Sequence, residues 1–444
     1  MTKRIAELGL LTAMLAALSF VTGAQERRGA LGRARNVILM VGDGMGDSEI
    51  SAARDYEVGP RGRLAMDSLP ATASIIVSAV YEDNPRLPVY VADSAASGTA
   101  WATGEKTSNG RISTSAQADR DLPTLLEIIQ RGGRRVGSVT TAELTDATPA
   151  VLASHVRLRE CQGPQDMANC PADRQSAGGP GSIAEQEVAH KVDVLLGGGR
   201  QRFAQPLDVR SSPAPTVIDL ARAADYAVVG SAAELATVRP GHRVLGLFAP
   251  GNMSLEWAGV PAVPHPGSGP QRCREGQRPS NEPSLAEMTR KAIDLLDDGG
   301  RRAPGFFLQV EGASIDKQNH ASNPCGQVGE TVAFDAAIRT ALDFARRDEK
   351  TLVIVTADHG HTSQIVATPS ETDHPAGAFS TLITREDAPL TLSYATNVPG
   401  RTQEHTGTEV RAVAEGPGSA AIHGTLDQTD LFGIVLAAMG LAAR

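Results

Sequence analysis

The chain has 444 residues, of which 41% are hydrophobic and 21% are charged. This length suits one large α/β domain with insertions, or two or three smaller domains, and it allows a sizeable core. The formal net charge of -9 argues against a protein built to bind the phosphate backbone of nucleic acid, although a local basic pocket for a small anion is compatible with it.

The first 24 residues have the features of a secretory signal peptide. Lys3 and Arg4 precede an apolar stretch from Leu8 to Val21, which ends in small residues. That stretch is too short to predict a membrane span, and the apolar residues Leu431 to Ala443 have the length of a buried helix. We therefore expect a periplasmic or secreted protein without a membrane segment.

Short apolar runs that end in polar residues alternate with helical patterns along the chain. The strand-like runs are, in order, NVILMVGDG, RVGSVTTAE, VDVLLGGG, GFFLQVEG and TLVIVTADH. Helical patterns lie in LPTLLEIIQRGG, LAEMTRKAIDLLDDGG and ETVAFDAAIRTALDFARR. This alternation predicts a three-layer α/β fold in which helices cover both faces of a large, mostly parallel central sheet.

The domain organisation follows from the same reading of the chain. Residues 25–35 form an N-terminal arm, and residues 36–444 are expected to form a single domain. The segment from about 205 to 277 ends in the Pro- and Gly-rich stretch VPAVPHPGSGPQRC, which indicates a loop-rich insertion.

The four cysteines are expected to form two disulfides, because an exported chain folds in an oxidising compartment. The short separation of Cys161 from Cys170 favours a local loop, which leaves Cys273 with Cys325, although the sequence alone permits three pairings. A zinc site of four thiolates is the alternative, but the sequence contains no CxxC pair.

Three carboxylates stand where strand-like runs end: Asp43, Glu311 and Asp358. In a parallel sheet the ligand site lies outside the carboxyl ends of the strands, where loops converge and helices begin. Each carboxylate taken alone is compatible with a helix cap or a loop at the sheet rim. The three together, with histidines close by, indicate a binding site.

Several of these histidines have the spacing of metal ligands. Asp316 and His320 are four residues apart, so one helical turn would place them on the same face, although a surface pair is the alternative. Asp358 and His359 are adjacent and would converge in a loop, and QEHTG supplies His405. Oxygen and imidazole donors suit zinc, and an all-oxygen subsite suits magnesium.

The stretch VADSAASGTAWATG places Ser94 among small residues where a helical pattern begins. Free N–H groups and the positive dipole end of a helix favour an anion there. Ser and Asp are also common N-cap residues, so a plain helix cap is the alternative to a nucleophile.

Seven motifs, in order, resemble those of bacterial alkaline phosphatases. They are VGDGMGDSEISAARDY, ADSAASGTAWATGEKTSNG, TAELTDATPAVLASHV, FFLQVEGASIDKQNHASNPCGQ, VTADHGHTSQ, QEHTGTEVR and GTLDQTDLFGIV. The resemblance runs from about Asn36 to the C-terminus. It implies a secreted phosphomonoesterase that hydrolyses small phosphate monoesters through a phosphoserine at Ser94, and a homodimer.

The resemblance also implies two Zn²⁺ and one Mg²⁺ per subunit. One zinc is then held by the residues that match Asp316, His320 and His405. The second is held by those that match Asp43, Asp358 and His359. Magnesium takes Asp43 again, with Thr148 and Glu311.

For the phosphate, the resemblance points to Arg159, since a planar guanidinium matches two oxygens of a terminal phosphate. Arg157 is a rival from the residues alone. Asp146 and Lys317 match groups that touch the magnesium waters and the phosphate, and they favour zinc and magnesium over cobalt.

The sequence departs from the family pattern at Asn319 and Glu160, and neither position is a ligand. Two other functions stay open. A phosphodiesterase or sulfatase of the same superfamily is one, although a sulfatase needs a Cys or Ser in an x-Pro-x-Arg context and Ser94 lies in SAASG. An exported phosphate- or zinc-binding protein without turnover is the other, and it gives no reason for a nucleophile at Ser94.

Overall fold

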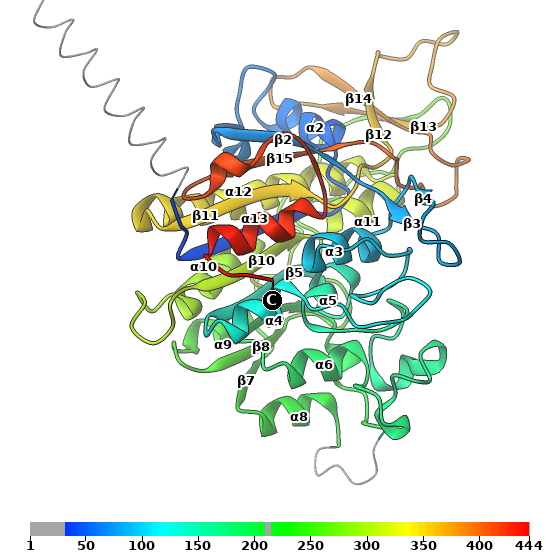
Figure 1. Cartoon of the computed structure of the whole chain (residues 1–444). Helices are drawn as coiled ribbons and strands as arrows, with labels where there is room; N and C mark the ends of the chain where they lie inside the picture. The colour runs from blue at the N-terminus through cyan, green and yellow to red at the C-terminus, as the bar shows by residue number, and fades with distance from the viewer. Residues whose placement is uncertain (1–31, 209–214, 444) are drawn as a thin grey trace, which may run out of the picture.

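The computed structural model describes residues 32–208 and 215–443, so the expected signal peptide and most of the expected N-terminal arm lie outside the described residues. A ten-stranded sheet has the order β16-β2-β15-β11-β1-β10-β5-β6-β8-β7 (Figure 1). Its strands are β1 (Asn36–Gly42), β2 (Ala71–Ile76), β5 (Arg135–Glu143), β6 (Val194–Gly198), β7 (Tyr226–Val229), β8 (Arg243–Leu247), β10 (Phe306–Gly312), β11 (Thr351–Ala357), β15 (Val410–Glu415) and β16 (His423–Asp427).

The large sheet is mostly parallel, as the sequence predicts. Of its ten strands, only β15 runs against its neighbours, β11 and β2. The central strands β1, β10 and β11 are buried along their whole length. Helices on both faces exclude water from such strands, which explains why they read as continuous apolar runs rather than alternating ones.

Two groups of helices cover the sheet (Figure 1). α10 and α12 pack against each other and the central strands, whereas α4, α5 and α13 belong to a second group that also contacts α3. The helices of these layers are α2 (Asp47–Glu57), α3 (Ser94–Thr103), α4 (Leu125–Arg131), α5 (Ala147–Ala153), α6 (Ile183–Ala189), α7 (Arg200–Phe203), α8 (Val217–Ala223), α9 (Ala232–Thr237), α10 (Leu285–Leu296), α11 (Ser314–His320), α12 (Pro324–Asp348) and α13 (Asp430–Ala438).

A smaller sheet lies beside the large one, at the upper right of Figure 1. Its order is β12 (Ser363–Val366), β14 (Pro389–Tyr394), β13 (Ala378–Ile383) and β9 (Ser268–Gln271), and a hairpin joins β3 (Ala79–Val80) to β4 (Pro88–Val89). One hydrophobic cluster extends through the large sheet from Ala34 to Met439. A second includes Trp257 and Tyr394.

Three elements differ from the sequence pattern. α12 begins at Pro324 rather than near Glu330, because the Asn323 side chain accepts a hydrogen bond from Gly326 N and proline suits the first helical turn. The segment 205–277 contains α8, β7, α9 and β8, so part of the expected insertion forms the edge of the large sheet. The C-terminal helix stops at Ala438, just before Gly440 with its positive φ of 67°.

The two expected disulfides are confirmed: Cys161 bonds to Cys170 and Cys273 bonds to Cys325. The first closes a short loop next to Arg159, and the second ties the loop after β9 to α12. Within the described ranges, no helix combines the length and the apolar character needed to cross a membrane.

Candidate active site

The three strand-end carboxylates meet at one edge of the sheet. Asp43 follows β1, Asp358 follows β11, and Glu311 is the penultimate residue of β10. Because β1 pairs with both β10 and β11 in parallel register, these positions are neighbours. All three are at most 4% exposed, so the fold buries a group of carboxylates that water does not stabilise.

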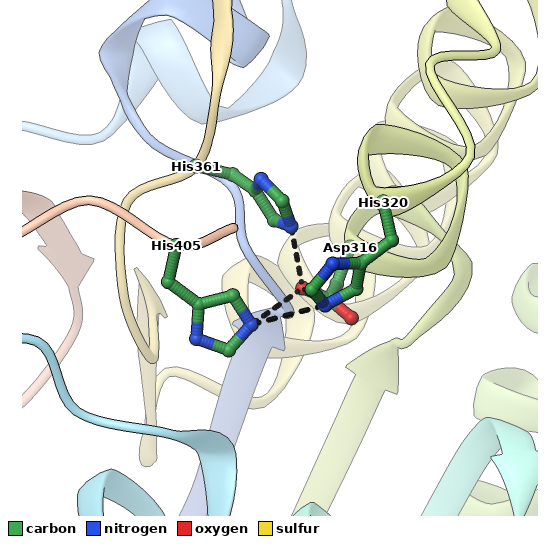
Figure 2. A group of neighbouring side chains, drawn as sticks. All are labelled: Asp316, His320, His361 and His405. Atoms are coloured by element: carbon green, nitrogen blue, oxygen red, sulfur yellow. Dashed lines mark hydrogen bonds and ion pairs between the residues drawn. The ribbon is translucent and has the colours of Figure 1, made fainter. Parts of the chain in front are cut away.

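Beside them lies the Asp316 cluster, formed by Asp316, His320, His361 and His405 (Figure 2). Asp316 Oδ1 lies 3.3 Å from His320 Nε2, 3.3 Å from His405 Nε2 and 3.0 Å from His361 Nε2. His320 Nε2 and His405 Nε2 are 3.1 Å apart. Asp316 and His320 come from one turn of α11, as their spacing predicts, whereas His405 arrives on the loop between β14 and β15.

Backbone carbonyls fix the orientation of two of these rings. Nδ1 of His320 lies against the Gln403 carbonyl oxygen, and Nδ1 of His405 lies 3.1 Å from the Ala92 carbonyl oxygen. A carbonyl oxygen only accepts, so each Nδ1 carries the proton and each Nε2 presents a lone pair to the cluster. This second contact is typical of histidines that bind a metal.

His361 has the opposite arrangement. Its Nδ1 accepts a hydrogen bond of 2.8 Å from the Thr362 backbone N–H, which leaves the ring proton on Nε2. That nitrogen points at Asp316, as Figure 2 shows. We therefore interpret His361 as a residue that positions Asp316 rather than as a metal ligand.

The Asp43 cluster, formed by Asp43, Asp358 and His359, lies next to Ser94. His359 Nε2 is 3.4 Å from Asp43 Oδ1, 3.2 Å from Asp358 Oδ2 and 3.4 Å from Ser94 Oγ. His359 Nδ1 faces the Gly360 carbonyl oxygen at 3.2 Å, so its Nε2 also presents a lone pair. The Ser94 hydroxyl thus borders a group of side chains whose chemistry suits a metal ion.

Both clusters fit metal ions. Donors bound about 2.0–2.1 Å from a tetrahedral zinc are separated by about 3.3–3.4 Å, close to the spacings here. Among the described residues, Asp43 Oδ1 and Asp358 Oδ2 are buried and make no hydrogen bond. Buried polar atoms without partners are costly, and a bound cation would satisfy both.

The electrostatics support the same interpretation. Burial raises the pKa of Asp43 well above its usual value, and the charges of Asp316 and Asp358 raise it further. Burial also raises the pKa of Glu311 to about 7 and that of Asp358 to about 6. Clustered carboxyl groups with raised pKa values do not ionise readily by themselves. A bound cation would stabilise their ionised forms.

A third group of donors consists only of oxygens, from Asp43, Thr148 and Glu311. Gln309 of β10 donates from Nε2 to the Thr148 carbonyl at 2.7 Å, which holds α5 against the strand that carries Glu311. Thr148 Oγ1 is buried and, within the described part of the chain, has no hydrogen-bond partner. An all-oxygen set of this kind suits magnesium.

Ser94 is not the cap of α3. That position belongs to Asp93, whose Oδ1 accepts a hydrogen bond of 2.9 Å from Ala96 N. Ser94 is the first helical residue and is 3% exposed, with its hydroxyl directed at His359. The cap interpretation that the sequence leaves open therefore applies to Asp93, and the hydroxyl of Ser94 is available for chemistry.

Two carboxylates hold Arg159 next to the start of α3, which carries Ser94. It donates from one nitrogen to Asp93 Oδ2 at 3.2 Å and from another to Asp146 Oδ1 at 2.8 Å. Lys317 Nζ donates to Asp146 Oδ2 at 2.7 Å. Burial alone would lower the pKa of Lys317, but the charge of Asp146 raises it, so the amine stays cationic. The rival Arg157 is exposed.

The structure thus brings every predicted site residue to one end of the sheet, and it adds two that sequence reasoning missed. His361 is the second histidine of TADHGH, and Asp93 directly precedes Ser94. Asn319 is buried and donates to the Ile315 carbonyl at 3.1 Å, and Glu160 is exposed. Neither departure from the family pattern lies among the ligands.

Comparison with known proteins gives a consistent result. The profile of the family described as alkaline phosphatase matches residues 34–395. The streptomycin-6-phosphate phosphatase of Streptomyces griseus is 53% identical over 99% of this chain and 98% of its own. The alkaline phosphatase of Escherichia coli is 46% identical over 92% of this chain and 86% of its own.

Solved structures confirm the fold. The alkaline phosphatase of the Antarctic bacterium TAB5 superimposes with a TM-score of 0.68 over 92% of this chain and 99% of that one, at 22% identity. The alkaline phosphatase of Thermus thermophilus gives a TM-score of 0.68 over 94% of each chain, at 22% identity. At this level of identity the likeness concerns the fold.

Proposed function

Because the chain belongs to the alkaline phosphatase family, and is thus a metal-dependent phosphomonoesterase, we propose that it works through a covalent phosphoserine at Ser94. The observation that carries this proposal is the position of Ser94 Oγ, 3.4 Å from His359 Nε2 at the edge of the Asp43 cluster. A serine hydroxyl is a weak nucleophile unless a base or a metal activates it.

We assign the ions as two Zn²⁺ and one Mg²⁺. Zinc would be held in the Asp316 cluster by Asp316, His320 and His405, and in the Asp43 cluster by Asp43, Asp358 and His359. Magnesium would be held by the oxygens of Asp43, Thr148 and Glu311. When bound, such ions stabilise negative charge on the attacking and leaving oxygens of an in-line displacement.

The protein's own cations would orient the phosphate. Arg159 presents a planar fork of N–H donors, and Asp93 and Asp146 hold that fork in place. Lys317 adds a second cation on the far side of Asp146. This arrangement recognises the terminal phosphoryl group rather than the alcohol, which favours hydrolysis of many different monoesters.

The proposed reaction has two displacements. Ser94 Oγ loses its proton and forms a bond to phosphorus, while the bond from phosphorus to the ester oxygen breaks and the alcohol leaves with a proton. Water then attacks phosphorus, and the bond to Ser94 Oγ breaks. The products are one alcohol and one inorganic phosphate, and the serine is regenerated.

The matched pair Ser94→Ala and Ser97→Ala tests this route. Both serines lie in α3 and are buried, but the Ser97 hydroxyl donates to the Ser94 carbonyl instead of facing His359. Acid quenching during turnover should trap a phosphoryl group on Ser94 in the native chain and in the Ser97 variant. The Ser94 variant should keep its zinc and lose turnover by several orders of magnitude. Near-native turnover in that variant would refute the covalent route.

Substrate preference distinguishes the proposed phosphomonoesterase from the alternative functions. An aryl monophosphate should be turned over far faster than a bis-aryl phosphate or an aryl sulfate, because Arg159 and Lys317 face a terminal dianion. A preference for the diester or the sulfate would favour a phosphodiesterase or a sulfatase. Stoichiometric phosphate binding without turnover would favour a binding protein.

A second, narrower candidate is hydrolysis of a phosphorylated aminoglycoside. It is favoured by the 53% identity with a protein named streptomycin-6-phosphate phosphatase, which extends over 99% of this chain. The formal net charge of -9 would also attract a cationic leaving group. A higher kcat/KM for streptomycin 6-phosphate than for an aryl phosphate would support it, and equal values would favour the broad phosphatase.

We also propose that residues 36–444 work as one domain in an exported homodimer. Support for export comes from the signal-like first 24 residues and from the two disulfides, which form in oxidising compartments. The dimer rests on resemblance to the family. Light scattering of the mature chain and fractionation of the producing cells test these two points.

A further inference from the structure

A second group of metal-binding side chains lies outside the catalytic site. Glu127 is in α4, His155 follows the end of α5, and His190 caps the end of α6. Asp146 stands at the other end of α5, so this helix separates the group from the catalytic cations. We call Glu127, His155 and His190 the α4–α6 cluster.

The spacing of the α4–α6 cluster is that of a tetrahedral metal site. Glu127 Oε1 lies 3.4 Å from His155 Nε2 and 3.4 Å from His190 Nε2. The three ligand atoms all lie within 4.8 Å of one another. Zinc with bonds of about 2.0–2.1 Å to nitrogen and oxygen separates its ligand atoms by about 3.3–3.4 Å.

The rings are also oriented as metal ligands are. His155 Nδ1 lies 2.9 Å from the Ser113 carbonyl oxygen, and His190 Nδ1 lies 2.7 Å from the Ala153 carbonyl oxygen. Each Nδ1 therefore carries the proton, as in His320 and His405 of the catalytic site. Two Nε2 atoms then face one carboxylate oxygen, and three acceptors at this spacing repel one another unless a metal ion or a proton on each ring lies between them.

The two carboxylate oxygens of Glu127 make different contacts. Glu127 is the third residue of α4, and its Oε2 accepts a hydrogen bond of 2.9 Å from Thr124 N in a capping box. This bond holds the side chain in place and leaves Oε1 directed at the two histidines. The ligand is thus pre-oriented by the helix start, which reduces the entropy lost on binding.

We propose that Glu127, His155 and His190 bind a divalent transition-metal ion of the zinc class as a structural site. The three ligands line an open hollow of about 480 Å³, which has room for water as the fourth ligand. Asp121 and Arg131 also line it, and their opposite charges offset each other. Nitrogen and oxygen donors without thiolate suit Zn²⁺ better than Mg²⁺ or Ca²⁺.

Such an ion would connect three separate helices. It would join α4 to the end of α5 and to the end of α6. His155 lies 28 residues after Glu127 in the sequence (155 minus 127), and His190 lies 63 residues after it (190 minus 127). A link that exists only in the folded chain stabilises it by mass action. Because α5 begins at Asp146, the site would also support the helix that carries part of the catalytic centre.

Protonated histidines paired with Glu127 are the alternative. Burial lowers the pKa of His155, but the contacts with Glu127 and the Ser113 carbonyl oxygen and the charge of Asp121 together outweigh burial and raise it, so a proton competes with a metal for the same lone pair. Metal counting distinguishes the two, because an ion pair takes up no zinc.

The experiment uses the holoenzyme reconstituted with excess Zn²⁺ and Mg²⁺ and then freed of unbound metal. His190→Gln removes a half-exposed ligand, and Glu127→Gln keeps the capping box while removing the charge. His423→Gln, at an exposed histidine of β16, is the matched control. Mass spectrometry measures the number of zinc ions per chain, and an aryl phosphate is the substrate for measuring turnover. Anomalous scattering from crystals locates the zinc ions.

The native chain and the control should carry one more zinc per chain than His190→Gln and Glu127→Gln, with equal turnover in all four. Anomalous density should lie between Glu127 Oε1 and the two Nε2 atoms. Equal zinc content in all four proteins, or no density at that place, would overturn the site. Failure of the phosphoserine experiment would leave this count unaffected, so the two proposals fail separately.

Discussion

The catalytic centre and the α4–α6 cluster are built from the same parts and differ in what surrounds them. His320 and His405 in the first, like His155 and His190 in the second, turn Nδ1 towards a backbone carbonyl and place Nε2 3.3–3.4 Å from a carboxylate oxygen. The catalytic centre adds several buried carboxylates, a serine hydroxyl and an arginine held by two aspartates. The α4–α6 cluster has one carboxylate and opens to a hollow of about 480 Å³.

The difference shows that ligand spacing alone does not make an active site. Hydrolysis needs a nucleophile beside the ligands and a cation aimed at the phosphate, the parts that we propose for Ser94 and Arg159 in the catalytic centre. Substitutions in the two regions should therefore have different effects. Those in the catalytic centre should strongly reduce turnover, whereas those in the α4–α6 cluster should change metal content or stability.

The largest effect should come from Asp358→Ala. Asp358 is fully buried, with Oδ2 3.2 Å from His359 Nε2, so its removal takes away a carboxylate of the Asp43 cluster. We expect turnover of an aryl phosphate to fall by about 10³-fold or more, with loss of about one zinc per chain. Native turnover in this variant would mean that the Asp43 cluster is not the catalytic one.

Arg159→Lys should have the next largest effect. A lysine keeps the charge but loses the planar fork that Asp93 and Asp146 orient, so kcat/KM should fall by about 10²-fold. Inhibition by inorganic phosphate should weaken in parallel. The matched control is Arg157→Lys, at an exposed position, which should leave both quantities unchanged. The opposite ranking of the two variants would favour Arg157 as the phosphate ligand.

His361→Asn should act through metal affinity. The ring presents Nε2–H to Asp316 at 3.0 Å, and such supporting contacts change metal affinity by about 10–100-fold. Turnover should fall at limiting zinc and return when zinc is raised, which would not happen if His361 took part in the reaction. An unchanged zinc dissociation constant would contradict the positioning role.

A buried carboxylate outside both regions gives the smallest effect and concerns stability. Burial raises the pKa of Glu330 in α12 to about 8, so the folded chain holds this proton at pH values where the unfolded chain has released it. Its contribution to the free energy of unfolding is therefore complete below the unfolded pKa of about 4.5 and is lost as the pH rises from there through about 8.

Glu330→Gln keeps an acceptor for Glu256 N and cannot ionise. Denaturant unfolding should show little change at pH 4 and a gain of at least about 1 kcal/mol for the variant at pH 9, with native turnover. The same pH dependence in both proteins would show that Glu330 is not the titrating group.

Much of the fold and of the site could be predicted from the sequence because the signals are local. The runs that became β1, β10 and β11 carry their carboxylates at or beside their ends, and Asp316 and His320 lie on one helical turn. Parallel pairing then brings the three carboxylates together without further information.

What the sequence could not supply depends on distant contacts. The tautomer of His405 is set by the Ala92 carbonyl, 313 residues away, and the role of His361 follows from the Thr362 N–H. The sequence did not predict the strands β7 and β8, which lie in a segment with a loop-rich end. Short strands near the edge of a sheet have only a weak hydrophobic pattern. The α4–α6 cluster joins residues from three helices that no motif connects.

The carboxylate of Asp93 has a consequence for how this enzyme can diversify. One of its oxygens caps the start of α3, next to Ser94, and the other holds Arg159, so the proposed nucleophile and the proposed phosphate ligand depend on one residue. A substitution there would disturb both at once, and neither can be tuned alone.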